Sequence, residues 1–207
     1  MSATSAPFGL RPVYHPSGLD RAFALANGIQ AVSTTGNVSA GYASNIFKGQ
    51  PVMMNTAGWI EVATSGTPFL GAFAGVEWTD ATGRRRVSDF WPANESFQVG
   101  SVVVYYYQDP NIVYEIQAAG SLDQTAIGDE FDITNVTNGS TTTGLSQCTL
   151  GTTAAGADSV KQMRVIDIAP YPDNAWGDSY TIVRVVIAEY QYGLIRVGGA
   201  NYSPIAI

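Results

Sequence analysis

The chain has 207 residues, of which 45% are hydrophobic and 11% aromatic, and its formal net charge is −7. This length and hydrophobicity are enough to bury a core, so the composition excludes an intrinsically disordered protein. Charged residues make up only 13% of the chain, about half of the usual share of about 25%, and the negative balance opposes general binding to nucleic acid.

The sequence predicts neither a secreted nor a membrane protein. Its start, MSATSAPFGLRP, lacks the basic residues and the apolar run of a signal peptide. No stretch approaches the roughly 18 apolar residues that cross a membrane. The single cysteine, Cys148, excludes a disulfide within the chain, so we expect a soluble protein made in a reducing cytoplasm.

Residues 1–20 predict an extended N-terminal arm, because they contain three prolines and two glycines and show no hydrophobic periodicity. Four apolar side chains in this arm, Phe8, Leu10, Val13 and Tyr14, have no obvious local core. Two alternatives follow: the arm packs against a neighbouring subunit, or it packs on its own domain. The next residues, 20–32, have the pattern of one or two helical turns that end at Gly28.

From residue 42 onward the pattern is that of β-structure. Short apolar runs at 52–54, 59–63 and 69–76 are separated by glycine-containing turns. The run SVVVYYYQ at 101–108 is the strongest strand candidate, and 112–118 is expected to pair with it across an Asp109-Pro110-Asn111 turn.

The later chain predicts two more strands, at 160–170 and 180–193, while 134–158 is either a long loop or flat threonine-rich strands. We therefore predict an all-β protein, a small barrel or jelly-roll-like sandwich with extended N- and C-terminal arms. One domain is expected over 21–197, with any division near 95–100. The tail at 198–207 ends apolar, and its side chains Tyr202, Ile205 and Ile207 are candidate contacts with a partner.

No pattern in the chain predicts catalysis or a cofactor. The only histidine, His15, could form a dyad with Cys148, but Cys148 alternates within LSQCTL as a buried core residue does. The chain has too few histidine and cysteine residues to form a zinc site, and its sequence contains no phosphate-binding loop. We expect a non-enzymatic protein without a cofactor.

Two acidic clusters leave alternatives open. Asp129, Glu130 and Asp132 contain carboxylates that a glycosidase could use, since such pairs meet only in the fold. Asp173 and Asp178, with Asn174, could bind Ca²⁺ through oxygen atoms. Asp and Asn beside proline and glycine more often form turns, which is the alternative for the second cluster.

The stretch TGRRRVSDFW at 82–91 places Arg84, Arg85 and Arg86 in a row, although the chain has only 10 basic residues. On a strand, Arg84 and Arg86 share one face and Arg85 lies on the other. The run could contact phosphate, form ion pairs with Asp80, Asp89 or Glu77, or form a protein interface with Trp91, Phe90 and Trp78. We favour the interface and expect Arg85→Glu with Arg86→Glu to weaken partner binding without loss of the fold.

Several phrases of the sequence resemble known virion proteins. The block NIFKGQPVMMNTAGWIEVATSGTPFLGAFAGVEW at 45–78 resembles the barrel core of head-decoration and capsid-stabilising proteins of tailed bacteriophages. The phrases TGRRRVSDFWPAN (82–94), DPNIVYEIQA (109–118) and PDNAWGD (172–178) resemble phage proteins encoded beside capsid genes. The chain is longer than the small trimeric members, so their symmetry does not transfer directly.

This resemblance implies a structural virion protein. It would bind the outside of an icosahedral head, stabilise contacts between major capsid protein subunits, and associate with itself as a trimer or dimer. It would be assembled in the bacterial cytoplasm and lie on the capsid surface, with no nucleic-acid or membrane partner. The alternatives are a head–tail connector, tail or knob component, and, from another class, a carbohydrate-binding module that uses Trp59, Trp78, Trp91 and Trp176.

Overall fold

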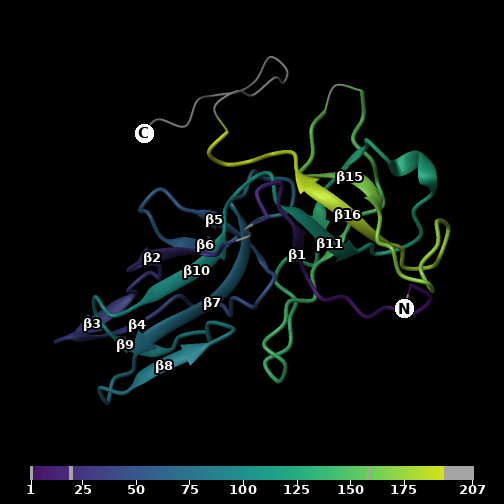
Figure 1. Ribbon diagram of the computed structural model, residues 1–207. Helices are drawn as coiled ribbons and strands as arrows, with labels where there is room; N and C mark the ends of the chain where they lie inside the picture. The colour runs from purple at the N-terminus through teal and green to yellow at the C-terminus, as the bar shows by residue number, and fades with distance from the viewer. Residues whose placement is uncertain (1, 19–20, 158, 194–207) are drawn as a thin grey trace.

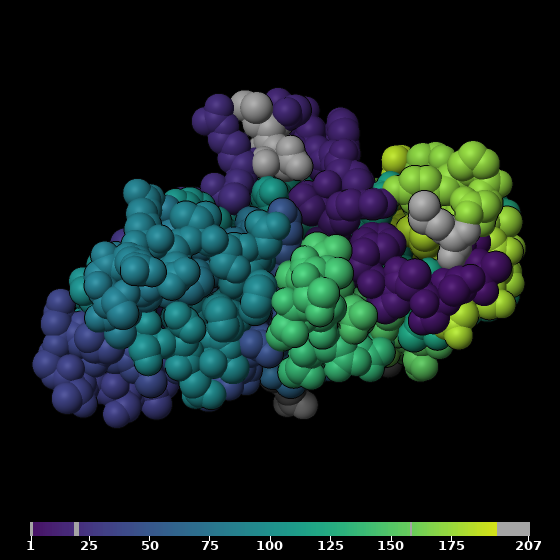
Figure 2. Space-filling view, turned by 90° about the horizontal axis from the view of Figure 1, so that it is seen from below, coloured from purple at the N-terminus to yellow at the C-terminus, as the bar shows by residue number. Residues whose placement is uncertain are grey.

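Two antiparallel sheets, one largely from each half of the chain, form most of the computed structural model, which describes residues 2–18, 21–157 and 159–193 (Figure 1). The prediction of an all-β protein with packed antiparallel sheets is confirmed. Figure 2 shows the blue and teal half beside the yellow-green half, with the purple N-terminal residues lying along the latter.

The first sheet has the strand order β2-β10-β7-β5-β6, and β8 pairs with the outer half of β7. Alternation fixes its inner face, since Val104 and Tyr106 of β10 are buried while their neighbours are half-buried. Its strands are β2 (Phe23–Ala26), β5 (Pro51–Met54), β6 (Ile60–Val62), β7 (Gly71–Thr79), β8 (Arg85–Ser88) and β10 (Val103–Tyr107). A small sheet beside it contains β3 (Ser33–Thr35), β4 (Val38–Ala40) and β9 (Ser96–Gln98).

The second sheet has the order β1-β11-β16-β15-β12, so a strand from the start of the chain forms its edge. Its members are β1 (Arg11–Tyr14), β11 (Val113–Gln117), β12 (Glu130–Phe131), β15 (Met163–Ile168) and β16 (Ile182–Ile187). A two-stranded ladder of β13 (Ile133–Thr134) and β14 (Thr149–Leu150) and one 3₁₀ turn, η1 (Gln124–Ala126), complete the described elements.

Each large sheet covers a hydrophobic cluster of its own. The cluster under the first sheet combines aliphatic and aromatic side chains, and the rings of Trp78 and Phe97 contact Trp91 edge to face at 5.5 and 5.9 Å. Gly41 makes room for this packing, because a Cβ there would lie 2.3 Å from the Trp91 ring. The second cluster is mostly aliphatic, and the Tyr190 ring packs against both clusters.

The two halves are joined by the return of the chain after β16. The main chain of Phe69 exchanges hydrogen bonds with Glu189 and Gln191, at 3.3 and 3.0 Å. The side-chain amide of Gln191 also bonds both main-chain groups of Met54, at 2.9 and 2.7 Å. The end of the second half therefore bonds to the first half at β5 and at the residue just before β7.

The expected hairpin of 101–108 with 112–118 is wrong. The strand β10 pairs with β2 and β7, whereas β11 pairs with β1 and β16 in the other sheet. The predicted turn at Asp109-Pro110-Asn111 is present, since the Ile112 N–H donates to the Asp109 carbonyl at 3.2 Å, but it carries the chain from one sheet to the other, and the Asp109 side chain binds His15. Both strands were predicted, but their sequences do not show that each one pairs with strands far away in the chain.

The helical turns expected at 20–32 are also absent from the described part of this range. Phe23–Ala26 form β2, which pairs with β10, and the Phe23 ring contacts Tyr106 at 5.9 Å. A partner strand outweighs a weak helical pattern of four or five residues. The described part of the range 134–158 is mainly loop, with the two-residue strands β13 (Ile133–Thr134) and β14 (Thr149–Leu150) as its only named strands. No helix in the described residues is long and apolar enough to span a membrane.

Candidate interaction surface

The arginine run lies on the hairpin of β7 and β8, whose turn is organised by Asp80. One carboxylate oxygen of Asp80 accepts hydrogen bonds from the Thr82 hydroxyl at 2.6 Å and from the main-chain N–H groups of Thr82 and Arg84 at 2.9 and 3.0 Å. The other oxygen accepts from Nε of Arg86 at 2.9 Å. These bonds, the one from the Thr82 hydroxyl first, hold the pKa of Asp80 far below its ordinary value.

The register of the hairpin separates the roles of Arg85 and Arg86. Arg86 lies opposite Trp78, on the face that covers the aromatic core, and its charge faces Asp80. Arg85 lies opposite Thr79 and forms an ion pair with Glu77. The hydrogen bond from Arg85 lowers the pKa of Glu77, and the same bond raises the pKa of Arg85. Ion pairing within the domain, one of the three alternatives, is therefore present for two of the three arginines.

Arg84 is the arginine that remains available. It is exposed, and its guanidinium has no ion pair within the described residues. Val87, on the same strand as Arg85, is 74% exposed. The outer edge of β8 has no strand partner in the described part of the chain. We call the exposed groups of Arg84, Arg85 and Val87, together with this free edge, the β8 surface.

Trp91 does not belong to this surface, which corrects the sequence prediction. Its side chain is fully buried, and its indole N–H donates to the carbonyl of Tyr42 at 3.2 Å. Trp78 is 5% exposed, and Phe90 is half-buried against the ring of Phe47, at 5.8 Å. The apolar area of these rings is used in the core, so the aromatic part of the expected hot spot is unavailable to a partner.

The N-terminal residues pack on their own chain rather than extending as an arm. The main-chain carbonyl of Ser2 accepts from Tyr180 at 2.8 Å, and the Gln117 amide holds Thr4 and Ala6. Gly9 crosses Gly49 so closely that a Cβ on Gly9 would lie 2.6 Å from the Gly49 carbonyl oxygen. Of the two alternatives for this segment, packing on its own domain describes residues 2–14.

The four apolar side chains predicted to contact a partner from the arm differ in how far they are buried. Leu10 is 1% exposed in the second core, so it cannot contact another subunit. Phe8 is half-buried, with the Arg11 guanidinium 4.6 Å above its ring. Val13 and Tyr14, 37% and 58% exposed, lie on the edge strand β1 and remain accessible. The other predicted contacts, Tyr202, Ile205 and Ile207, and the tail at 198–207 lie outside the described residues.

Arg11 belongs to a polar cluster that sequence reasoning missed. Glu115, nearly buried on β11, accepts hydrogen bonds from Arg11 at 2.6 Å, from the Tyr171 hydroxyl at 2.5 Å and from Arg184 at 3.4 Å. Burial opposes the charge, but the Tyr171 and arginine bonds outweigh it and lower the pKa of Glu115. Alternation gave no signal, because an acid at the centre of an apolar strand resembles any solvent-facing position.

The proposed cysteine–histidine dyad is not assembled. Cys148 is fully buried with Sγ 3.8 Å from the Gly49 carbonyl oxygen, and burial raises the pKa of its thiol to about 11. His15 instead bonds Asp109 through Nε2 at 2.8 Å. Ser17 lies on the other side of the ring, where its hydroxyl oxygen is 2.5 Å from Nδ1 and its main-chain N–H donates to Nδ1 at 3.1 Å. Ser17, His15 and Asp109 therefore form a hydrogen-bonded row, and the Gly18 N–H closes a turn on the His15 carbonyl at 2.8 Å.

The acidic clusters are similarly occupied. Glu130 pairs with Arg164 at 2.5 Å and Asp132 with Lys161 at 3.1 Å. Asp178 accepts from the Ala175 N–H at 2.8 Å and from the Ser2 hydroxyl, which fits the turn alternative. The described residues contain no group of three or more His, Cys, Asp or Glu that could hold a metal ion.

Comparisons with known proteins do not assign the chain to a family. No family model, no curated protein and no solved structure matches the chain.

Proposed function

We propose that this chain is a non-enzymatic structural protein of a tailed-phage virion, which binds the outside of the head and stabilises contacts between major capsid protein subunits. The proposal rests on the sequence phrases that resemble decoration proteins. The observation that best supports it is the β8 surface, a free strand edge that presents arginines and an exposed valine.

The chemistry of the β8 surface defines the capsid face that it would fit. Arg84 has no ion pair within the described residues, and Arg85 is 71% exposed even though it pairs with Glu77. A complementary face would therefore carry carboxylates opposite Arg84 and an apolar group opposite Val87. The free edge of β8 offers main-chain hydrogen bonds to an added strand. Val13 and Tyr14 on β1 would form a second, smaller contact.

Copy number is the measurement that tests the location. We expect mass spectrometry of purified particles to find this chain in numbers comparable with the major capsid protein. A count that suits a single ring or one set of fibres would favour the connector, tail or knob alternative instead. Absence from the particle would reject a virion role altogether.

Charge reversal at Arg84 tests the surface itself. Arg84→Glu should weaken binding to heads that lack the protein by roughly tenfold, which corresponds to about 1.4 kcal/mol. It should leave the fold intact, because Arg84 has no ion pair to lose within the described residues. The double variant at Arg85 and Arg86 is a poorer probe than the sequence indicated, since it would place two glutamates beside Glu77 and Asp80.

The matched control is Arg21→Glu. Arg21 is exposed and directly precedes the part of the chain that forms β2, which lies at the opposite edge of the same sheet from β8. Both variants change the net charge equally. If the two weaken binding to the same extent, general electrostatic attraction rather than the β8 surface holds the protein on the head.

A further inference from the structure

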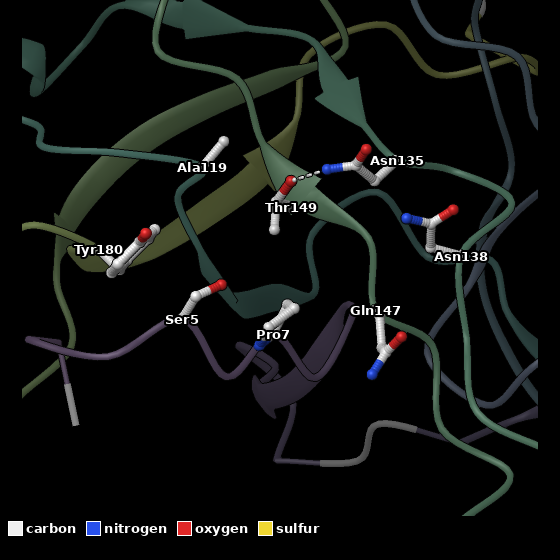
Figure 3. A pocket seen from close by; sticks show the side chains of 8 residues that line it. All are labelled: Ser5, Pro7, Ala119, Asn135, Asn138, Gln147, Thr149 and Tyr180. Carbon is white, nitrogen blue, oxygen red and sulfur yellow. Dashed lines mark hydrogen bonds between the residues drawn. The ribbon is translucent and has the colours of Figure 1, made fainter.

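A polar pocket beside the N-terminal segment has a lining without any charged side chain. Its volume is about 380 Å³, within the range of ligand sites. Four separate parts of the chain contribute to it: Ser5 near the N-terminus, Ala119 after β11, Asn138 and Gln147 between β13 and β14, and Tyr180 before β16 (Figure 3). No element of the proposed capsid contact takes part in it.

Elsewhere in this molecule, glutamine side chains bind main-chain N–H and C=O groups. The amide of Gln117 accepts from the Ala6 N–H at 2.8 Å and donates to the Thr4 carbonyl at 3.1 Å. Gln191 does the same with both groups of Met54. Gln162 accepts from the Ile133 N–H at 2.9 Å and donates to the carbonyls of Thr64 and Thr67 at 2.9 and 2.7 Å. An amide side chain matches the donor and acceptor of a peptide unit without bringing in charge.

The pocket also contains amide side chains, but these bind no main-chain group of the described residues. Asn135 is engaged, since its amide donates to the Thr149 hydroxyl at 3.1 Å. The side-chain amides of Asn138 and Gln147 have no hydrogen bond to any described residue, and neither do the main-chain N–H and C=O of Ser5. Figure 3 shows Asn138 and Gln147 on neighbouring segments on one side of the pocket, with Ser5 and Tyr180 on the other.

We propose that this pocket binds an extended, uncharged peptide segment of a partner protein. The amides of Asn138 and Gln147 would hold its main chain on one side, as Gln117 holds residues 4–6, and the main chain of Ser5 would pair with it on the other. Small neutral side chains suit the site, because a charged group would lose water without meeting an opposite charge. The partner would be recognised mainly through its backbone, and only weakly through its sequence.

The same pocket has hydroxyls and a tyrosine, which are also typical of saccharide sites. A peptide is favoured because Gln117 and Gln191 each already bind one short main-chain segment through both a donor and an acceptor, and because Ser5 offers a main-chain N–H and C=O. The proposal goes beyond a role on the phage head, since it concerns the isolated chain and is tested without any capsid.

The test is an NMR titration of the full-length, ¹⁵N-labelled protein with the blocked peptide acetyl-Ala-Thr-Ser-Ala-Pro-amide. This probe has the sequence of residues 3–7, a segment that Gln117 of the protein already binds through its main chain. We expect saturable shifts of the side-chain amide signals of Asn138 and Gln147 and of the Ser5 main-chain signal, with Kd on the order of 1 mM.

Paired variants separate binding at the pocket from general association. Asn138→Ala with Gln147→Ala should weaken peptide binding at least about tenfold. Because both side chains are exposed, the spectrum of this variant should remain that of the folded protein. Gln124→Ala removes an exposed amide from η1 and should change nothing. Equal affinity of the double variant and the unaltered protein would overturn the proposal.

Glucose, galactose and N-acetylglucosamine, titrated separately, provide the opposing outcome. Shifts at Asn138 and Gln147 with a sugar but not with the peptide would make the pocket a saccharide site and overturn the proposal. The absence of shifts with every probe up to tens of millimolar would overturn it as well. Saturation by the peptide alone is the result that we expect.

Discussion

The sequences of the N-terminal segment and of the β7–β8 hairpin both predict contacts with a partner. The structure uses the groups of the first within the chain and leaves part of the second exposed. Both contain groups without an obvious local partner, apolar in one case and basic in the other. Residues 2–10 use these groups within the chain, through Gln117, Gly49 and the second core. The hairpin uses two of its arginines internally and leaves Arg84, Val87 and a strand edge open.

The two regions differ in how far away in sequence the partners of their side chains lie. Leu10 and Trp91 each find a core assembled from residues far away in sequence, so their local surroundings gave no sign of burial. Arg85 and Arg86 find acids on the adjacent strand, which local pairing could anticipate. A group that lacks a neighbour in sequence is therefore weak evidence for an intermolecular partner, whereas a free edge in the folded chain is stronger evidence.

Trp91→Ala should have the largest effect and tests whether the base of the hairpin belongs to the core. Removing the buried indole leaves a cavity against Trp78 and Phe97, and we expect a loss of about 3–5 kcal/mol in the free energy of unfolding. Urea unfolding followed by circular dichroism measures it. A variant of unchanged stability that binds heads poorly would return Trp91 to the interface and break the comparison.

Leu10→Ala should cost somewhat less, about 2–5 kcal/mol, because the segment around it keeps its main-chain bond to Gly49. Val13→Ala is the matched control on the next strand, and exposure of Val13 should keep its effect within about 0.5 kcal/mol. Equal effects of the two substitutions, again by urea unfolding, would mean that the segment is no more anchored than a free arm.

Asp80→Asn should have the smallest of the three effects, and this effect should be present near neutral pH and shrink in acid. The pKa of Asp80 is lowered in the folded state, so its carboxylate stabilises the fold at any pH above the unfolded value of about 3.9. That contribution declines as the pH falls below this value, because the unfolded chain takes up a proton first.

Thermal unfolding between pH 7 and pH 2 measures the change. The melting temperature of the unaltered protein should fall more steeply below pH 4 than that of Asp80→Asn, so that the two curves converge in acid. Parallel curves would show that the turn does not depend on the charge of Asp80, and would weaken the distinction between a preorganised hairpin and an ordinary loop.

Seven of the strands were predictable, whereas β1, β2, β3, β4 and β9 were not. The apolar runs at 52–54, 59–63 and 69–76 correspond to β5, β6 and β7, and the later runs contain β10, β11, β15 and β16. Their partners were not, because alternation defines a face but not a neighbour, which is why β10 and β11 were paired wrongly. β8 was missed as a named strand, since three arginines gave no apolar alternation.

The candidate site was predictable only at its charged part. Arg84–Arg86 and their acids, Glu77 and Asp80, lie close together in sequence, so their association followed from local strand geometry. The polar pocket could not have been found, because Ser5, Gln147 and Tyr180 come from distant segments and uncharged amides carry no recognisable motif.

The return of the chain after β16 has a consequence for how the protein is made. Met54 and Phe69 exchange hydrogen bonds with residues 189–191, and β1 pairs with β11, about a hundred positions later. On a ribosome, which releases the chain from its N-terminus, the first sheet would emerge long before the segment that bonds Met54 and Phe69. Until then its strands would be open to other chains, so synthesis rate and crowding of nascent chains should govern the yield of folded protein.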